Sequence, residues 1–134
     1  MMLVLALALF SSSITFAQEN DCATLEQCQK SVDANPNSSM AHYRMGLILF
    51  MNGQWGHASL EFLKAEHGDL EPEWTEVWSH VYAGKAYDLT DQRERAINEY
   101  KFVLRISDVW RDSKVLREAK KEAAEYIKSP YRRP

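Results

Sequence analysis

Apolar residues recur along most of this chain at the spacing of an α-helix. Leu25, Cys28 and Val32 fall at i, i+3 and i+7, which predicts one apolar helix face over residues 24–35. The helix is expected to end there because Pro36 disfavours the α conformation of the residue before it. No stretch shows the two-residue alternation of a β-strand, so the chain is predicted to be all-α. The same periodicity predicts five further helices, over residues 40–51, 55–66, 72–89, 93–106 and 113–128.

Two of the predicted helix pairs are related by an offset of 38 residues. A period of this length with small residues at fixed places predicts helical hairpins stacked along a solenoid. Glycine and alanine are expected where neighbouring backbones nearly touch, and aromatic residues are expected to fill the space between helices. The eight repeat-packing residues are Gly46, Ala58, Phe62 and Ala65, matched by Gly84, Ala96, Tyr100 and Val103.

This register resembles the tetratricopeptide repeat (TPR), whose usual period is about 34 residues. The fold implied by the resemblance is a TPR-like helical-hairpin solenoid of about two and a half repeats plus a C-terminal capping helix. The last predicted helix is polar over most of its girth, as expected where such an array meets solvent. The Sel1-like class is an alternative helical array of similar period, although it requires a different glycine and alanine spacing. The implied segments are a half repeat (24–35), two repeats (39–67 and 73–107), the capping helix (113–128) and a tail (129–134).

The resemblance further implies that the first helix of each hairpin lines a shallow concave groove for a partner protein or peptide. The lining is rich in methionine and aromatic residues, which supply adaptable contact area at binding surfaces. A hydrophobic segment of a partner is therefore predicted to bind there. A second interpretation stays open, in which the terminal helices cover these positions as part of the core. The predicted groove residues are Met40, Tyr43, Leu47, Phe50, Trp78, Val81, Lys85 and Asp88.

The start of the chain predicts export. Residues 1–10 are wholly apolar, and Thr15 and Ala17 are small residues two apart, so residues 1–17 are predicted to be a signal peptide cleaved after Ala17. A basic region before the apolar run is missing, and an uncleaved membrane anchor is the alternative. That run is shorter than the ~20 residues that span a bilayer. The mature protein is expected in the periplasm or outside the cell, with residues 18–23 as a flexible lead-in.

Cys22 and Cys28 are the two cysteines of the chain. An even number of cysteines in an exported protein favours pairing, so a disulfide is predicted at the start of the first helix. The alternative is a buried Cys28 with an unpaired Cys22 in a frayed segment. No other soft ligand lies nearby in the sequence, so no metal site is expected at the cysteines.

Charge and motifs exclude several classes of function. The 134 residues include 16 basic and 19 acidic ones, and this balance provides no basic surface for nucleic acid. No nucleophile–base or phosphate-binding motif is present, and the 38-residue offset accounts for the spacing of His42 and His80 without a metal. We therefore expect no enzyme, no cofactor and no metal, but a non-enzymatic protein–protein interaction module. The alternative is a structural component of an envelope or secretion assembly, which would form homo-oligomers.

Overall fold

The computed structural model describes residues 22–107 and 113–134, and the chain is all-α over these residues. The predicted signal peptide, residues 1–17, and residues 18–21 of the lead-in lie outside the described residues. No helix in the described part of the chain combines the length and the apolar character needed to cross a bilayer. The six helices are α1 (Leu25–Ala34), α2 (Ser39–Met51), α3 (Trp55–Glu66), α4 (Trp74–Asp88), α5 (Arg93–Arg105) and α6 (Ser113–Lys128).

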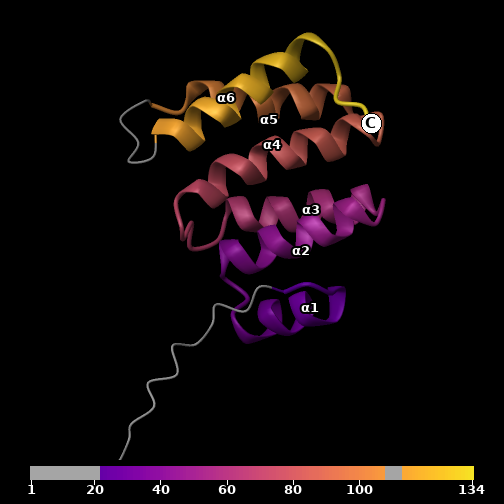
Figure 1. Ribbon diagram of the computed structural model, residues 1–134, viewed down its shortest axis with the longest axis vertical. Coiled ribbons are helices and arrows are strands. Elements are labelled where there is room, and N and C mark those ends of the chain that lie inside the picture. The colour runs from indigo at the N-terminus through magenta and orange to yellow at the C-terminus, as the bar shows by residue number, and fades with distance from the viewer. Residues whose placement is uncertain (1–21, 108–112) are drawn as a thin grey trace, which may run out of the picture.

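Each helix packs against the next one in chain order, like a series of antiparallel hairpins, so that the chain climbs from α1 to α6 (Figure 1). Contacts that skip one helix occur between α2 and α4 and between α4 and α6. These three helices are therefore neighbours on one side of the stack, and α3 and α5 lie between them in sequence. The side formed by α2, α4 and α6 carries the candidate site described below.

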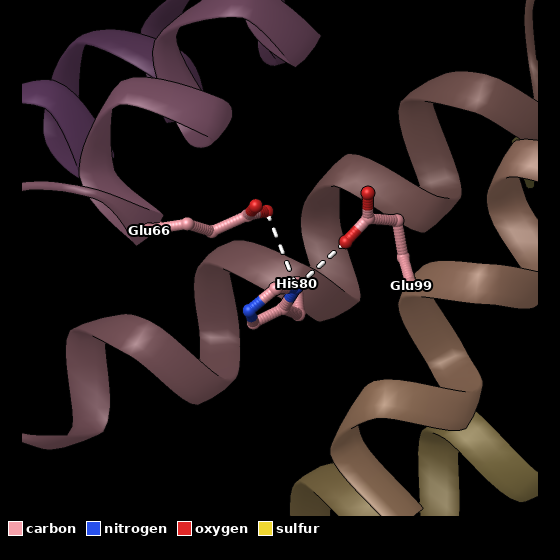
Figure 2. A group of neighbouring side chains, drawn as sticks. All are labelled: Glu66, His80 and Glu99. Atoms are coloured by element: carbon pink, nitrogen blue, oxygen red, sulfur yellow. Dashed lines mark hydrogen bonds and ion pairs between the residues drawn. The ribbon is translucent and has the colours of Figure 1, made fainter.

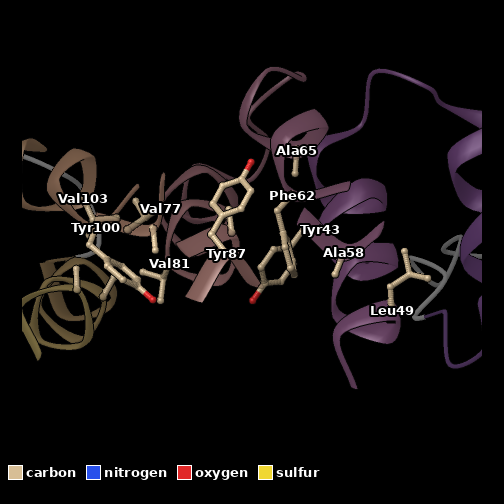
Figure 3. Packing of buried hydrophobic residues seen from close by; sticks show 14 of the residues in the cluster. Tyr43, Leu49, Ala58, Phe62, Ala65, Val77, Val81, Tyr87, Tyr100 and Val103 are labelled. Atoms are coloured by element: carbon tan, nitrogen blue, oxygen red, sulfur yellow. The ribbon is translucent and has the colours of Figure 1, made fainter. Parts of the chain in front are cut away.

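Two glycines allow an aromatic ring to lie against a helix backbone. A Cβ added at Gly46 in α2 would come within 2.6 Å of the ring of Phe62 in α3. A Cβ added at Gly84 in α4 would come within 2.4 Å of the ring of Tyr100 in α5. Both rings are fully buried (Figure 3). The other four residues of the 38-residue register, Ala58, Ala65, Ala96 and Val103, are also fully buried.

The turns that close the two central hairpins are also alike. Gly53 after α2 has φ 76°, and Asp91 after α4, which lies 38 residues later, has φ 58°. In both turns the following residue donates its N–H to a carbonyl oxygen near the end of the preceding helix, at 2.9 Å. A left-handed residue in this place commonly ends a helix, and aspartate is one of the few non-glycine residues that adopt it readily.

The connection between α3 and α4 folds onto the start of α2. The carboxylate of Asp69 accepts the N–H of Ser39 at 3.0 Å, and the hydroxyl of Ser39 accepts the N–H of Leu70 at 2.9 Å. A negative side chain is favourable at a helix N-terminus. Gly68 fits here because an added Cβ would lie 2.7 Å from the carbonyl oxygen of Asn37. The residues that lengthen this connection thus form a hydrogen-bonded loop.

The predicted disulfide between Cys22 and Cys28 is confirmed. Cys28 is fully buried in the core, and Cys22 packs against the same core from the segment before α1. The helix begins at a threonine cap, because the side chain of Thr24 accepts the N–H of Gln27 at 3.2 Å. The bridge therefore fixes the entry of the chain into α1, and it is consistent with an oxidising compartment.

Candidate functional site: an aromatic cleft on α2, α4 and α6

An aromatic cleft opens where α2, α4 and α6 meet. Trp74, Trp78 and Tyr82 follow one another at four-residue steps, so they form one stripe along α4, and all three are half-buried. The ring of Tyr43 on α2 meets Trp74 edge to face, with 5.3 Å between the ring centres. The cleft has a volume of about 420 Å³ and is lined by Tyr43, Trp74, Trp78, Tyr82, Val115 and Glu122.

Lys85 sits beside this cleft within a group of three tyrosine rings. Its ammonium nitrogen lies 4.6 Å from the ring centre of Tyr82, 5.4 Å from that of Tyr126 and 5.2 Å from that of Tyr131. It also lies 2.6 Å from Oε2 of Glu122 on α6. The carboxylate and the ring faces together compensate the burial of this charge. Lys85 therefore joins α4 to α6.

Asp88 at the end of α4 ties together four parts of the chain. Its side chain has no exposed area. It accepts hydrogen bonds from Arg93 at 2.8 Å, from the Tyr100 hydroxyl at 2.9 Å and from the backbone N–H of Tyr131 at 2.8 Å. Arg93 also donates to two carbonyl oxygens in the last turn of α6, at 2.7 and 2.8 Å. Burial, followed by the charge of Asp88, raises the pKa of Tyr100, so this phenol stays a hydrogen-bond donor.

The C-terminal segment, residues 129–134, folds back against the ends of α2, α4 and α6. The ring centre of Tyr131 lies 6.0 Å from that of Phe50 and 5.2 Å from that of Tyr126. Arg133 reaches the carbonyl oxygen of Met51 at 3.4 Å. The sequence analysis treated these residues only as a tail. The one local signal of their packing was Tyr131, an aromatic residue between proline and arginine.

The structure divides the eight predicted groove residues into two groups. Tyr43, Val81 and Lys85 are buried, with exposed fractions of 8%, 0% and 7%, and the side chain of Asp88 is buried as well. These four could reach a partner only if α6 and the C-terminal segment moved away. For them the core interpretation describes the folded chain. The other four, Met40, Leu47, Phe50 and Trp78, are half-buried.

The polar groups of the aromatic cleft are held in their neutral or paired forms. Burial is the main cause that raises the pKa of Tyr43, and burial with the nearby charge of Glu122 raises that of Tyr82. Both phenols are therefore neutral at physiological pH. Glu122, the acidic residue of the lining, is paired with Lys85. The cleft thus offers aromatic faces and hydroxyl groups, which suit an apolar or aromatic side chain better than an ion.

Each of the two repeat-related histidines has a carboxylate partner that the sequence analysis missed. His42 Nδ1 lies 2.7 Å from Glu61 Oε2, and His80 Nδ1 lies 2.6 Å from Glu99 Oε2. Both pairs span 19 residues, because Glu61 and Glu99 are themselves 38 residues apart. Applying the 38-residue offset to every charged residue would have revealed these pairs.

Comparison with known proteins assigns no family to the chain. No protein-family model, no curated protein and no solved structure matches it. The function must therefore be argued from the six-helix arrangement and from the chemistry of its surface.

Proposed function

We propose that this chain is a TPR-like adaptor that binds a partner protein or peptide without catalysing a reaction. The 38-residue register, the two glycine–aromatic contacts and the matching turns support a stack of related hairpins. In such a stack, α2, α4 and α6 would form the face that receives a partner. The observation that carries the proposal is the aromatic cleft on this face, with Trp74, Trp78 and Tyr82 half-exposed side by side.

The chemistry of the cleft suggests the kind of partner segment. Aromatic residues are enriched where protein surfaces meet, because they supply a large contact area with few torsions to order. The volume of about 420 Å³ lies near the low end of small-ligand sites. It suits a few apolar or aromatic side chains of a partner rather than a long buried segment. Half-buried Met40 and Leu47 on α2 would extend the contact beyond the cleft.

The proposed place of action is the periplasm or the cell exterior. The Cys22–Cys28 disulfide supports an oxidising compartment. The apolar N-terminal run and the small residues before position 18 support export by a signal peptide. An adaptor in that compartment would act on envelope or secreted proteins.

A second candidate function is a structural part of an envelope assembly that forms homo-oligomers. The observation in its favour is that Met51 and Leu60, which lie outside the cleft, are 69% and 54% exposed. Light scattering coupled to size-exclusion chromatography separates the two functions. A stable monomer supports the adaptor, and an oligomer that persists on dilution supports the assembly component.

The adaptor proposal is tested by selecting peptides on the immobilised full chain and measuring their affinities. We expect the selected peptides to be rich in apolar and aromatic residues. Trp78→Ala should weaken their binding by about 30-fold, which is the effect of a strong interface residue. Leu60→Ala is the matched control, because Leu60 is exposed outside the cleft, and it should bind as the unchanged chain does.

Two results would contradict the proposal. The first is equal loss of binding in Trp78→Ala and Leu60→Ala, which would place the peptides elsewhere. The second is loss of the helical circular dichroism signal in Trp78→Ala, which would make Trp78 a core residue.

A further inference from the structure

A group of three buried side chains lies where α3, α4 and α5 meet, away from the aromatic cleft. It consists of Glu66 in the last turn of α3, His80 in α4 and Glu99 in α5 (Figure 2). His80 Nδ1 lies 2.6 Å from Glu99 Oε2 and 3.4 Å from Glu66 Oε1. One ligand atom from each residue can be chosen so that all three lie within 4.8 Å of one another. Both carboxylates therefore point at the same imidazole nitrogen.

Glu66 is the member of this group that the fold leaves unsatisfied. Its side chain is only 3% exposed, and its Oε1 has no hydrogen-bond partner among the described residues. The nearest donor, His80 Nδ1, is shared with the closer Glu99. A buried carboxyl oxygen without a partner is unusual, since buried polar groups are nearly always hydrogen-bonded. The orphaned oxygen is aimed at the centre of the group.

The electrostatics of the group leave room for a cation. Burial, together with the charges of Glu99 and Glu76, raises the pKa of Glu66 to about 9. At neutral pH this carboxyl accordingly holds a proton. A bound cation would replace that proton and compensate both carboxylates at once.

We propose that Glu66, His80 and Glu99 form a site for a divalent transition-metal ion such as Zn²⁺. One imidazole nitrogen and two carboxylate oxygens form a donor set that zinc accepts, and three protein ligands leave a fourth position for water. Zinc ligands at about 2.0–2.2 Å from the ion lie about 3.3 Å from one another. The separations of 2.6 to 4.8 Å in the group come within rotations of the glutamate side chains of this arrangement.

Binding has a defined proton balance. The ion takes the place of the proton on Glu66, and that proton is released to solvent. His80 binds through Nδ1, which must carry no proton in the complex. Affinity should therefore rise with pH in the neutral range. The ion would connect α3 of one hairpin to α4 and α5 of the next, so it should also stabilise the stack.

The first hairpin contains a natural control for this site. His42 and Glu61 repeat the His80–Glu99 pair, with Nδ1 and Oε2 at 2.7 Å. There, the other histidine nitrogen lies 2.8 Å from the carbonyl oxygen of Pro36. Lys64 lies 2.7 Å from the second oxygen of Glu61. Among the described residues no third ligand completes a metal group at this pair.

The test measures Zn²⁺ binding to the full chain by calorimetry, after removal of metals with EDTA. The unchanged chain should bind one ion per chain and melt at a higher temperature with zinc. Glu66→Gln should lower the affinity at least tenfold and abolish the shift in melting temperature. The amide has the size of the neutral carboxyl that Glu66 carries, so the variant should fold, and Glu99→Gln carries the same expectation. Glu61→Gln, the matched control, should behave as the unchanged chain.

Three outcomes would overturn the proposal. They are the absence of zinc binding to the unchanged chain, binding that Glu66→Gln and Glu99→Gln leave intact, and an equal loss of affinity in Glu61→Gln. The last two would show that zinc binds to other groups, such as the exposed His57 and His67. Binding should also release protons, which is measured by repeating the titration in buffers of different ionisation enthalpy.

Discussion

A single methyl group added at Gly84 tests the packing on which the helix stack depends. The new Cβ would lie 2.4 Å from Cε1 and 2.7 Å from Cζ of Tyr100, well inside the ordinary carbon–carbon contact of about 3.5–4 Å. The ring cannot simply turn aside, because it is fully buried and its hydroxyl donates to Asp88 at 2.9 Å. The Gly84→Ala variant must therefore push α4 and α5 apart or break that hydrogen bond.

The expected loss of stability follows from three terms. Overpacking of a filled core costs about 1–3 kcal/mol. A weakened hydrogen bond to the Asp88 carboxylate adds to the loss, since bonds to charged groups contribute about 1.5–3 kcal/mol. The better helix propensity of alanine offsets about 1 kcal/mol. A net loss of about 1–3 kcal/mol should lower the melting temperature by about 4–8 °C for each kcal/mol.

Gly56→Ala is the matched control for this prediction. Gly56 is also helical, but it is exposed and an added Cβ would meet nothing within 4 Å. Its replacement should leave stability unchanged or raise it by up to about 1 kcal/mol. The assay is urea and thermal unfolding followed by circular dichroism, with Gly46→Ala as a second test of the close approach. If Gly84→Ala proved as stable as Gly56→Ala, the close contact between α4 and α5 would be refuted.

Two further predictions concern buried charges. Asp88→Asn should lower the free energy of unfolding by about 2–3 kcal/mol, because Arg93 loses its carboxylate partner and the hydroxyl of Tyr100 loses a charged acceptor. An unchanged midpoint in urea would contradict this. With EDTA present, the stability of the unchanged chain relative to Glu66→Gln should fall as the pH rises from about 6 to 9. The folded state holds the pKa of Glu66 at about 9 against a usual value of 4.5, facing Glu76, His80 and Glu99, so only the unfolded chain ionises freely there. A difference that does not vary with pH would show that Glu66 is already ionised in the folded state.

The features that the sequence predicted are those with a short or periodic signature. Helical periodicity is visible within a few turns, so the helices were found where the structure has them. The contact of Gly46 with Phe62 and that of Gly84 with Tyr100 follow from matched sizes at matched positions. The pairing of two cysteines six residues apart is equally local. None of these inferences needs to know how distant parts of the chain meet.

The features that the sequence did not predict depend on contacts between distant residues. Tyr131 binds the carboxylate of Asp88 across 43 residues, and no local pattern announces such a contact. A run of apolar residues on one helix face looks the same whether the chain itself or a partner covers it. Lys85 shows the difficulty, because a lysine is normally exposed, whereas Glu122 and three tyrosine rings permit its burial here. The boundary between core and binding surface therefore required the structure.

The two histidine–glutamate pairs show how one substitution can turn a structural motif into a candidate site. Cys28 in α1 and Phe62 in α3 are the fully buried residues that correspond in the stack, and four residues beyond them lie Val32 and Glu66. Val32 packs as a partly buried apolar side chain, whereas Glu66 places a carboxyl oxygen without a hydrogen-bond partner among the described residues. Replacing a buried charged group by an apolar residue of suitable shape is commonly neutral or stabilising. Stability alone therefore favours a residue such as valine at position 66, and the carboxylate there is better explained by an ion that it binds than by the packing of the hairpins.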